Sequence, residues 1–352
     1  MAALADEIRA WGAELGFQQV GISDTQLDAA EQHLDSWLAD GMQGDMEYMA
    51  RHGHKRSRPQ ELVPGTTRII SVRMDYLPEP AQTTINILKN PQVAYVSRYA
   101  LGRDYHKLLR RRLARLADRI RDKIGDYGYR VFTDSAPVLE KAVAEKAGLG
   151  WIGKHSNLIS RASGSWFFLG EIYTDLPLPT DESAAEHCGT CRACMDVCPT
   201  RAIVAPYRVD ARLCISYLTI EYRGIIDESL RPLMGNRIYG CDDCQLVCPW
   251  NRFSSLTKED DFLVRNGLDQ PALVELFSWT EQQFLDRFEG SAIRRIGFDS
   301  WQRNIAIAMG NAPHSAEICS ALEDRLPDAT DIVAEHIRWA LQQQNIKRRD
   351  TT

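Results

Sequence analysis

The first half of the chain alternates between helical and strand-like spacings of its apolar residues. Residues 3–15 and 27–40 have the spacing of amphipathic helices. A further helix is expected at Ala136–Ala147, where Pro137 suits the first turn. Between the helices lie short β-rich runs, at Gln19–Ile22, Arg68–Met74, Val93–Tyr99, Tyr129–Thr133 and Ser165–Tyr173. This alternation predicts an α+β domain built on one sheet.

The pattern changes near residue 180 and divides the chain into three parts. The proline-containing run Leu176–Thr180 and the acidic residues after it mark the first boundary. In the last part, Trp301–Met309 and Asp331–Leu341 each carry an apolar stripe, and these two weakly similar copies suggest paired helices of the HEAT type. We expect a sheet-and-helix domain at 1–180, a cysteine-rich module at 181–258 and a helical segment at 259–352.

A strongly basic helix is expected between Arg103 and Lys123. Nine Lys or Arg residues and three Asp residues fall in this stretch, over apolar residues at helical spacing. The basic face is either solvated or binds a polyanion, and composition does not separate these readings. The whole chain has a net charge of -6, which argues against non-specific nucleic-acid binding over its entire surface.

Seven of the nine cysteines form two closely spaced runs. Cys188–Pro199 has the C-x2-C-x2-C-x3-C-P spacing of modules that hold two four-iron clusters, in which the fourth cysteine binds the other cluster. Cys241–Pro249 lacks a first cysteine because Ile238 stands there, and Cys214 can replace it. The spacing therefore predicts one [4Fe–4S] cluster on Cys188, Cys191, Cys194 and Cys248, and a second on Cys198, Cys214, Cys241 and Cys244.

Other uses of these cysteines are less consistent with the pattern. Two zinc sites need as many thiolates, but zinc does not require the Cys-Pro ending of both runs. A disulfide framework is disfavoured because 352 residues can bury a full core. Cys319 lies in an apolar helical stretch and is expected to be a small core residue. The cysteines thus predict one-electron transfer.

The sequence also indicates where the protein works. No apolar run approaches the length of a membrane span, and the acidic N-terminal residues do not fit a secretory signal. Iron-binding thiolates suit a reducing compartment. We expect a cytoplasmic protein, with a monomer as the default.

Two short motifs lie in the N-terminal part. Gly148–Gly153 matches G-x-G-x-x-G, but it follows an expected helix and precedes a strand, the reverse of the order in a dinucleotide site. We therefore expect no nicotinamide site there. Asp134 ends an expected strand just before a helix. By position it is a helix N-cap, and the alternative is a carboxyl group that projects at the sheet edge as an acid.

Three blocks of the sequence resemble the epoxyqueuosine reductase family. They are Tyr95–Lys107, Thr133–Ile159 with its Gly-Trp-Ile-Gly-Lys-His-Ser-Asn-Leu-Ile, and Ser216–Asn251 with its Tyr-Gly-Cys-Asp-Asp-Cys-Gln-Leu-Val-Cys-Pro-Trp-Asn. The resemblance runs from the first helix to the C-terminal helices. It implies a cobalamin- and iron–sulfur-dependent enzyme that reduces epoxyqueuosine to queuosine, with loss of water. The implied substrate is the wobble base of tRNAs with GUN anticodons, the acceptors of Asp, Asn, His and Tyr.

The resemblance also implies site residues. Asp134 matches the proton donor, and burial against the corrin should raise its pKa. Cobalamin is expected base-off with no protein histidine on cobalt, and Leu109 indeed stands where a D-x-H-x-x-G motif would have glycine. Core packing is the alternative reading for the two leucines among the implied cobalamin contacts. These contacts are Arg56, Ser97, Asp134, His155, Leu158, Leu169 and Ser216.

The implied partners are tRNA and an external low-potential electron donor. Tyr222 and Arg223, the basic helix and the C-terminal helices are the candidate tRNA surface. The alternative for Tyr222 is an aromatic side chain that supports the cluster fold. Two other functions are alternatives. A related corrinoid enzyme such as a reductive dehalogenase typically adds an export signal and a larger N-terminal region. A ferredoxin-like carrier leaves the block Asp134–Ile159 without a purpose.

Overall fold

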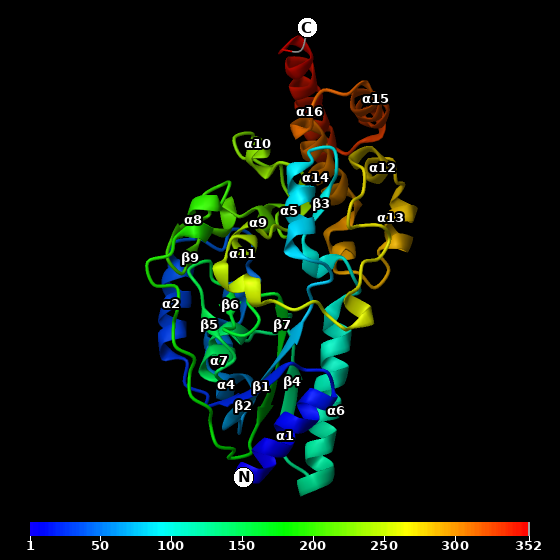
Figure 1. Cartoon of the computed structure of the whole chain (residues 1–352). Coiled ribbons are helices and arrows are strands. Elements are labelled where there is room, and N and C mark those ends of the chain that lie inside the picture. The colour runs from blue at the N-terminus through cyan, green and yellow to red at the C-terminus, as the bar shows by residue number, and fades with distance from the viewer. Residues whose placement is uncertain (351–352) are drawn as a thin grey trace.

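The computed structural model describes residues 1–350 and is built around one antiparallel sheet. The sheet lies in the lower half of Figure 1, with the strand order β1-β2-β7-β4. β2 and β7 pair along their whole lengths, from Arg68 opposite Thr174 to Asp75 opposite Phe167. The four strands are β1 (Gln19–Ser23), β2 (Arg68–Asp75), β4 (Tyr129–Phe132) and β7 (Phe167–Thr174).

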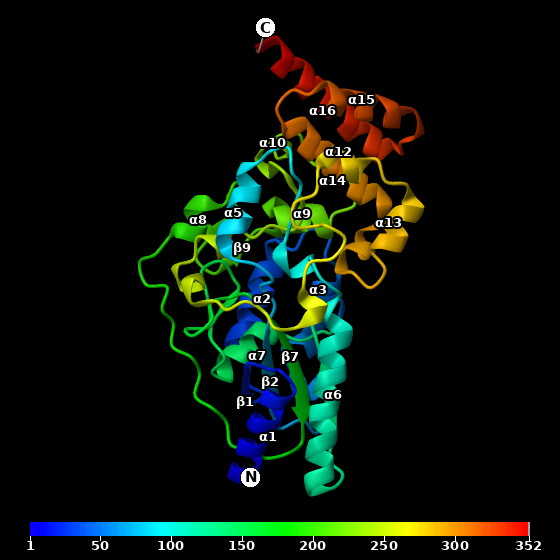
Figure 2. The same ribbon diagram turned by 45° about the vertical axis from the view of Figure 1, so that its right-hand side comes forward.

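Helices cover both faces of this sheet. α1 (Ala2–Glu14) and α6 (Tyr105–Ile124) pack on one face, and Figures 1 and 2 both show α6 running alongside the strands. Leu109, Leu113 and further apolar residues of α6 are fully buried there, as the helical spacing predicts. α7 (Glu140–Lys146) covers the other face. Short elements complete this part: α2 (Asp28–Ala39), α3 (Tyr48–Arg51), α4 (Pro59–Leu62), α5 (Ala81–Lys89), β3 (Tyr95–Val96), β5 (Trp151–Ile152) and β6 (Leu158–Ile159).

Some element boundaries differ from those expected. α7 begins at Glu140, four residues later than predicted, because Thr133–Val138 forms tight turns with Ser135 N–H bonded to Thr133 O and Val138 N–H bonded to Ala136 O. β3 is shorter than the predicted strand because a 3-10 helix starts at Arg98. Gly148–Gly153 follows α7 and contains β5, so a helix precedes the glycines and a strand follows, the reverse of the order in a dinucleotide site.

The cysteine-rich module packs above the sheet in Figure 1 and consists of short elements. Its helices α8 and α11 each contain one cysteine of a run and pack against each other. β10 pairs in parallel with β3 and so joins the module to the N-terminal part. The elements are α8 (Ala193–Val197), β8 (Ile203–Ala205), β9 (Arg208–Val209), α9 (Ile215–Ile220), α10 (Arg231–Met234), β10 (Arg237–Tyr239) and α11 (Asp243–Leu246).

The C-terminal helices form the top of the molecule in both views. α14 packs against α12, α16 and the module. Buried Arg303 of α14 fixes this contact by donating hydrogen bonds to the carbonyl oxygens of Leu218, Tyr222 and Gly224. Cys319 is only partly buried on α15, so the prediction of a core position is wrong. The helices are α12 (Leu273–Phe277), α13 (Glu281–Arg287), α14 (Gly297–Asn311), α15 (Ala316–Arg325) and α16 (Asp331–Asp350).

Within residues 1–350, none of the helices combines the length and the apolar character that a membrane crossing requires.

Candidate active site

Eight of the nine cysteines surround two cavities. A cavity of about 60 Å³ is lined by Cys188, Cys191, Cys194 and Cys248. A larger cavity of about 370 Å³ is lined by Cys198, Cys214, Cys241 and Cys244. The structure thus divides the thiols into the two sets that the spacing predicts. Four converging thiols are the donor set of one four-iron cluster, so each set fits such a cluster.

A buried carboxylate holds the second cysteine run in place. Asp242, between Cys241 and Cys244, accepts hydrogen bonds from Tyr95 Oη (2.5 Å), Ser97 Oγ (2.6 Å) and the Arg98 amide (2.9 Å). Burial raises the pKa of Asp242, although these donors oppose the rise. Asp242 was not predicted from the sequence, because the prediction of the clusters used only the spacing of the cysteines. The Cys-Asp-Asp-Cys sequence itself is the signal that was available.

Three of the expected cobalamin contacts line the larger cavity: Ser97, His155 and Ser216. His155 is buried, and its Nε2 has no hydrogen-bond partner among residues 1–350, whereas its Nδ1 accepts a bond from the Asn157 amide. Burial lowers the pKa of His155 to about 4, so the ring is neutral. A buried, unsatisfied nitrogen at a cavity wall fits a ligand that brings hydrogen-bonding groups, as the amides of a corrin do.

The other three expected contacts besides Asp134 do not line this cavity. Leu158 and Leu169 pack together in a small apolar cluster with Phe167, which does line the cavity. In the structure the two leucines are therefore core residues. Arg56 is buried elsewhere, where its Nη2 donates to the Tyr48 carbonyl oxygen and its Nε has no partner within the described chain.

Asp134 follows β4 in a left-handed backbone conformation, with φ of 47°. Its carboxylate accepts hydrogen bonds from Tyr105 Oη and from His106 Nε2, the latter at 3.3 Å. The Tyr105 ring stacks on Phe168 with centroids 3.8 Å apart, and both rings line the larger cavity. Because α7 starts six residues later without a side-chain cap, the N-cap reading of Asp134 is wrong. Its backbone N–H instead donates to Glu140 Oε1 at 2.5 Å.

His106 lies between two carboxylates. Its Nδ1 is 2.6 Å from Asp104 Oδ1, and its Nε2 faces Asp134. Burial alone would lower the pKa of His106, but the hydrogen bonds and charges of Asp104 and Asp134 raise it to about 9. His106 is therefore an imidazolium at neutral pH. The sequence did not predict this role for His106, which was noted only as part of an incomplete D-x-H-x-x-G motif.

The same contacts act on Asp134. Burial raises the pKa of Asp134, but the hydrogen bonds from His106 and Tyr105 outweigh it and hold the pKa below the ordinary value. The expectation that burial against a corrin raises the pKa of Asp134 stays a prediction, because these contacts are those of the protein's own residues alone. About half of the side chain is exposed (53%), so solvent screens these contacts. Of the two groups that donate to the Asp134 carboxylate, Tyr105 and His106, the imidazolium of His106 is the more acidic and is the nearby source of a transferable proton.

Two more carboxyl groups, those of Glu140 and Glu171, interact electrostatically with Asp134 and were not predicted from the sequence. Burial, together with the charge of Asp134, raises the pKa of Glu140 to about 8. Glu171 is fully buried in β7, and within residues 1–350 neither of its carboxyl oxygens has a hydrogen-bond partner. Burial raises its pKa well above the ordinary value. Both groups are protonated at neutral pH. An acidic residue inside the apolar run Phe167–Tyr173 was the available signal for Glu171.

The candidate tRNA residues also have structural roles. Five of the nine basic residues of Arg103–Lys123 form ion pairs within the protein, for example Lys123 with Glu7 and Arg112 with Glu259. Arg223 Nη1 donates to Ile296 O at 2.9 Å, and Tyr222 Oη donates to Ile225 O at 3.1 Å. The intramolecular ion pairs reduce the positive charge that α6 presents to a polyanion.

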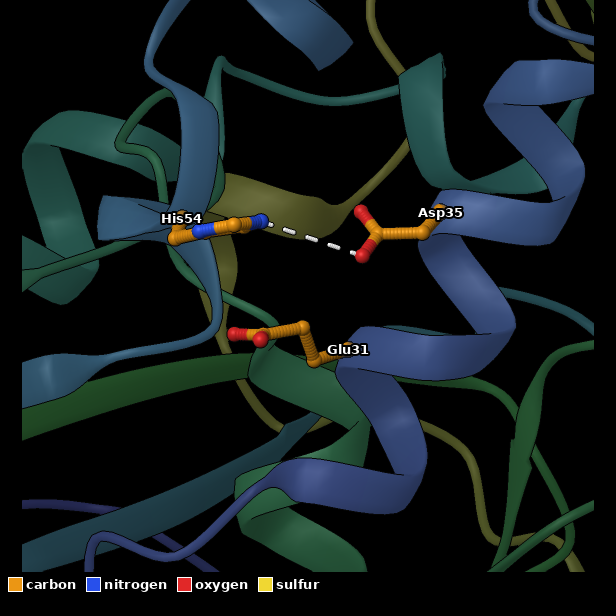
Figure 3. Close-up of side chains that lie close together, drawn as sticks. All are labelled: Glu31, Asp35 and His54. Atoms are coloured by element: carbon orange, nitrogen blue, oxygen red, sulfur yellow. Dashed lines mark ion pairs between the residues drawn. The ribbon is translucent and has the colours of Figure 1, made fainter.

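Glu31, Asp35 and His54 form the one group of potential metal ligands found among the described residues apart from the cysteines. Figure 3 shows the two acids on α2 and His54 opposite them, with His54 Nε2 3.8 Å from Asp35 Oδ2. Both oxygens of Glu31 already accept hydrogen bonds from Arg58, which lowers the pKa of Glu31 to about 2. This is an ion-pair cluster with a competing guanidinium, not a metal-binding arrangement.

Comparison with known proteins identifies relatives along the whole chain. The family "Epoxyqueuosine reductase QueG, DUF1730" matches residues 56–135, and the family "4Fe-4S double cluster binding domain" matches residues 187–251. An epoxyqueuosine reductase of Pseudomonas aeruginosa is 58% identical over 341 residues, which cover 97% of this chain and 94% of that protein.

Solved structures show the same fold. One is epoxyqueuosine reductase from Bacillus subtilis with its catalytic aspartate loop swung out of the active site, at 26% identity and a TM-score of 0.88 over 97% of this chain and 90% of that chain. Another is an epoxyqueuosine reductase with an epoxyqueuosine-modified stem loop of tRNA-Tyr, at 24% identity and a TM-score of 0.83 over 97% and 99% of the two chains. With 58% identity over nearly its full length, the chain belongs to the epoxyqueuosine reductase family of oxidoreductases and carries a 4Fe-4S double cluster binding domain.

Proposed function

We propose that this protein reduces epoxyqueuosine to queuosine at the wobble position of tRNAs with GUN anticodons, the acceptors of Asp, Asn, His and Tyr. The larger cavity is the observation that carries the proposal. One part of its wall holds the thiols Cys198, Cys214, Cys241 and Cys244, and another part holds Tyr105, the hydrogen-bond partner of Asp134. A path for electrons and a path for protons thus meet in one cavity, and removal of an epoxide oxygen as water needs both.

The cofactors in this proposal are two [4Fe–4S] clusters and cobalamin. Each set of four cysteines around a cavity would hold one cluster, Cys188, Cys191, Cys194 and Cys248 the first, and Cys198, Cys214, Cys241 and Cys244 the second. When bound, cobalamin supplies a low-valent cobalt that can act on the epoxide carbons. Ser97, His155 and Ser216 would contact it in the larger cavity. The further proposed contacts, which lie outside the lining of this cavity, are Arg56, Asp134, Leu158 and Leu169.

The proposal keeps cobalamin base-off, with no protein histidine on cobalt. Both nitrogens of His106 are engaged by carboxylates, so this residue is not available as a ligand. His155 has a free Nε2 at the cavity wall, and its role in the proposal is to bind an amide of the cofactor. An electron paramagnetic resonance spectrum of the bound cobalt(II) form tests this, because a nitrogen ligand would split its signal.

Asp134 is the proposed proton donor. Reduction of the epoxide consumes two electrons and two protons, and both carbon–oxygen bonds break as a double bond forms and water leaves. The imidazolium of His106 can pass a proton to Asp134 across their hydrogen bond, and Asp104 holds the ring in place. Cofactor and tRNA would exclude water from the half-exposed carboxyl group of Asp134. This desolvation would raise the pKa of Asp134, so that the carboxyl group can hold the proton that it donates.

The domain limits 1–180, 181–258 and 259–352 remain our proposal for the cobalamin-binding part, the two-cluster module and a HEAT-like helical part. Tyr222, Arg223 and the exposed cations of α6 would contact the anticodon stem loop, whose splayed bases stack on aromatic rings and whose phosphates bind Arg and Lys. We propose a cytoplasmic monomer that receives electrons from an external low-potential donor.

Anaerobic reconstitution with iron, sulfide and cobalamin, followed by turnover on tRNA that contains epoxyqueuosine, tests the function. We expect about eight irons, a base-off corrinoid spectrum and the appearance of queuosine. Asp134→Asn should keep both cofactors and lose turnover. The control Asp118→Asn, on the exposed side of α6, should keep both cofactors and its turnover. Binding of iron without any corrinoid would reduce the protein to an electron carrier and refute the proposal.

A further inference from the structure

The two cysteine-lined cavities differ in their access to solvent. Cys191, which lines the smaller cavity, is exposed, whereas the thiols of the larger cavity are partly buried and share it with Tyr105 and Phe168. His155 lines both cavities and so lies between them. Electrons from outside the protein would therefore arrive at the smaller cavity, and the surface around Cys191 is where a donor has to approach.

This surface has an exposed apolar centre. Val247 and Phe253 are 37% and 42% exposed, and Trp250, between them in sequence, lines the smaller cavity. The Trp250 ring lies 6.0 Å from Phe253 and 5.0 Å from Trp151, which is buried. Single exposed apolar residues are common, but Val247 and Phe253 flank the partly exposed Trp250 at one cysteine-lined cavity, and such a group marks a contact surface.

Cations rim the apolar centre. Arg252 lies over the Phe253 ring at 4.6 Å, and Arg192, next to Cys191, is two-thirds exposed. Lys154 lines the smaller cavity and donates hydrogen bonds to the carbonyl oxygens of Gly189 and Cys191. Two acids lie in the same region. Asp196 is 3.8 Å from Arg192, and Glu186 accepts a hydrogen bond from Tyr207. In a chain with a net charge of -6, this rim is a local excess of positive charge.

We propose that the surface formed by Lys154, Arg192, Val247, Trp250, Arg252 and Phe253, the docking face, binds an acidic protein that carries one electron at low potential. The proposal rests on the proposed function, because it requires a cluster at the smaller cavity. A small apolar centre with a charged rim suits the short-lived complexes of electron transfer, which bury little area. Opposite charges speed the encounter without making the complex tight.

The electron balance fits a carrier that docks twice. Each encounter oxidises one carrier by one electron and reduces the enzyme by one electron. Two encounters supply the two electrons that, with two protons, convert the epoxide into the alkene and water. Because the carrier leaves between encounters, its complex with the docking face has to be weak and fast.

The test compares two reductants on the reconstituted holoenzyme with epoxyqueuosine-containing tRNA. The protein probe is a reduced plant-type [2Fe–2S] ferredoxin, an acidic low-potential carrier, and the small-molecule reductant is dithionite at saturation. We expect the double variant Arg192→Glu/Arg252→Glu to lose about tenfold or more of the ferredoxin-driven rate and to keep its dithionite-driven rate and iron content. Arg130→Glu, a charge reversal on the exposed edge strand β4, should leave both rates unchanged.

Two further measurements keep the test decisive if the double variant loses iron. Salt also weakens the binding of tRNA, so the quantity compared is the ratio of the two rates at saturating tRNA. Between about 50 and 500 mM salt the ferredoxin-driven rate of the unmodified enzyme should fall steeply relative to the dithionite-driven rate. Phe253→Ser should raise the KM for ferredoxin without changing the KM for tRNA. A ratio of the two rates that does not change with salt, or a KM for tRNA that rises with both reductants in Phe253→Ser, overturns the proposal. Absence of turnover with either reductant would instead refute the proposed function.

Discussion

Titration of His106 tests the electrostatics around Asp134. The carboxylates of Asp104 and Asp134 lie 2.6 and 3.3 Å from the two ring nitrogens and raise the pKa of His106 from 6.5 to about 9. This net rise corresponds to roughly 3 kcal/mol, a lower limit for the interaction between the imidazolium and the two carboxylates because burial opposes it. Asp104 is the nearer carboxylate and is less exposed (35% against 53%), so we assign it roughly 2 kcal/mol and Asp134 roughly 1 kcal/mol.

These magnitudes predict the response to removal of each charge. Asp134→Asn should lower the pKa of His106 to about 8, and Asp104→Asn should lower it to about 7.5, at 1.36 kcal/mol for each tenfold change in proton affinity. The assay is a titration by nuclear magnetic resonance of protein labelled with nitrogen-15 in histidine, without cobalamin. The signal is assigned by its absence in His106→Gln. A pKa near 6.5 in the unmodified protein, or equal effects of the two substitutions, would refute the reasoning.

The same contacts make stability depend on pH. The folded protein binds the His106 proton more tightly than the unfolded chain does. Its contribution to stability is therefore complete below about pH 6.5 and is lost as the pH rises towards about 9. The unmodified protein should exceed His106→Gln in unfolding free energy at pH 6, and the difference should vanish at about pH 10. His33→Gln, on the exposed side of α2, is the matched control. A difference that does not change with pH would contradict the prediction.

Three other substitutions have defined outcomes. Cys214→Ser should remove about half of the bound iron by colorimetric analysis, whereas Cys319→Ser should remove none. Arg303→Met should lower the free energy of unfolding by about 3 kcal/mol in thermal melts, because buried carbonyl oxygens lose their donor, and Arg338→Met on an exposed position should not. Glu171→Gln should stabilise the protein in urea, and more at pH 8 than at pH 5, because the raised pKa of the native carboxyl group costs the unmodified protein stability as the pH rises. An equal or opposite effect at the two pH values would show that Glu171 is ionised in the folded state.

Local periodicity accounts for the parts of the fold that the sequence predicted well. The buried stripe of α6 follows from leucines at helical spacing, and β7 follows from an apolar run that is buried on both faces in the centre of a sheet. The division of the thiols around two cavities followed from the spacing of the cysteines. In that spacing the last cysteine of each run, Cys198 or Cys248, joins the set formed mainly by the other run. Each of these features depends on residues close in sequence or on a fixed motif.

The environment of Asp134 could not be predicted because its parts come from distant segments. His106 lies in the first turn of α6, 28 residues before Asp134, and only the packing of α6 against the sheet brings them together. Proline suits a first helical turn, so the pattern predicted a helix from Ala136 and a capping role for Asp134. In the structure, the turns after Thr133 expose the Asp134 amide to Glu140, and the carboxylate turns to α6 instead.

The larger cavity exists only because separate parts of the chain are held together. Its wall combines Phe168 of β7 and Tyr105 of α6 with the cysteines of the module. Two sets of buried hydrogen bonds join these parts: those that Asp242 accepts at the end of β3, and those of Gln245 and Asn251 with Ser165 just before β7. Loss of either set leaves polar groups buried without partners. The geometry between the thiols and Asp134 therefore depends on residues that touch neither, and substitutions there should impair turnover while all eight cysteines remain.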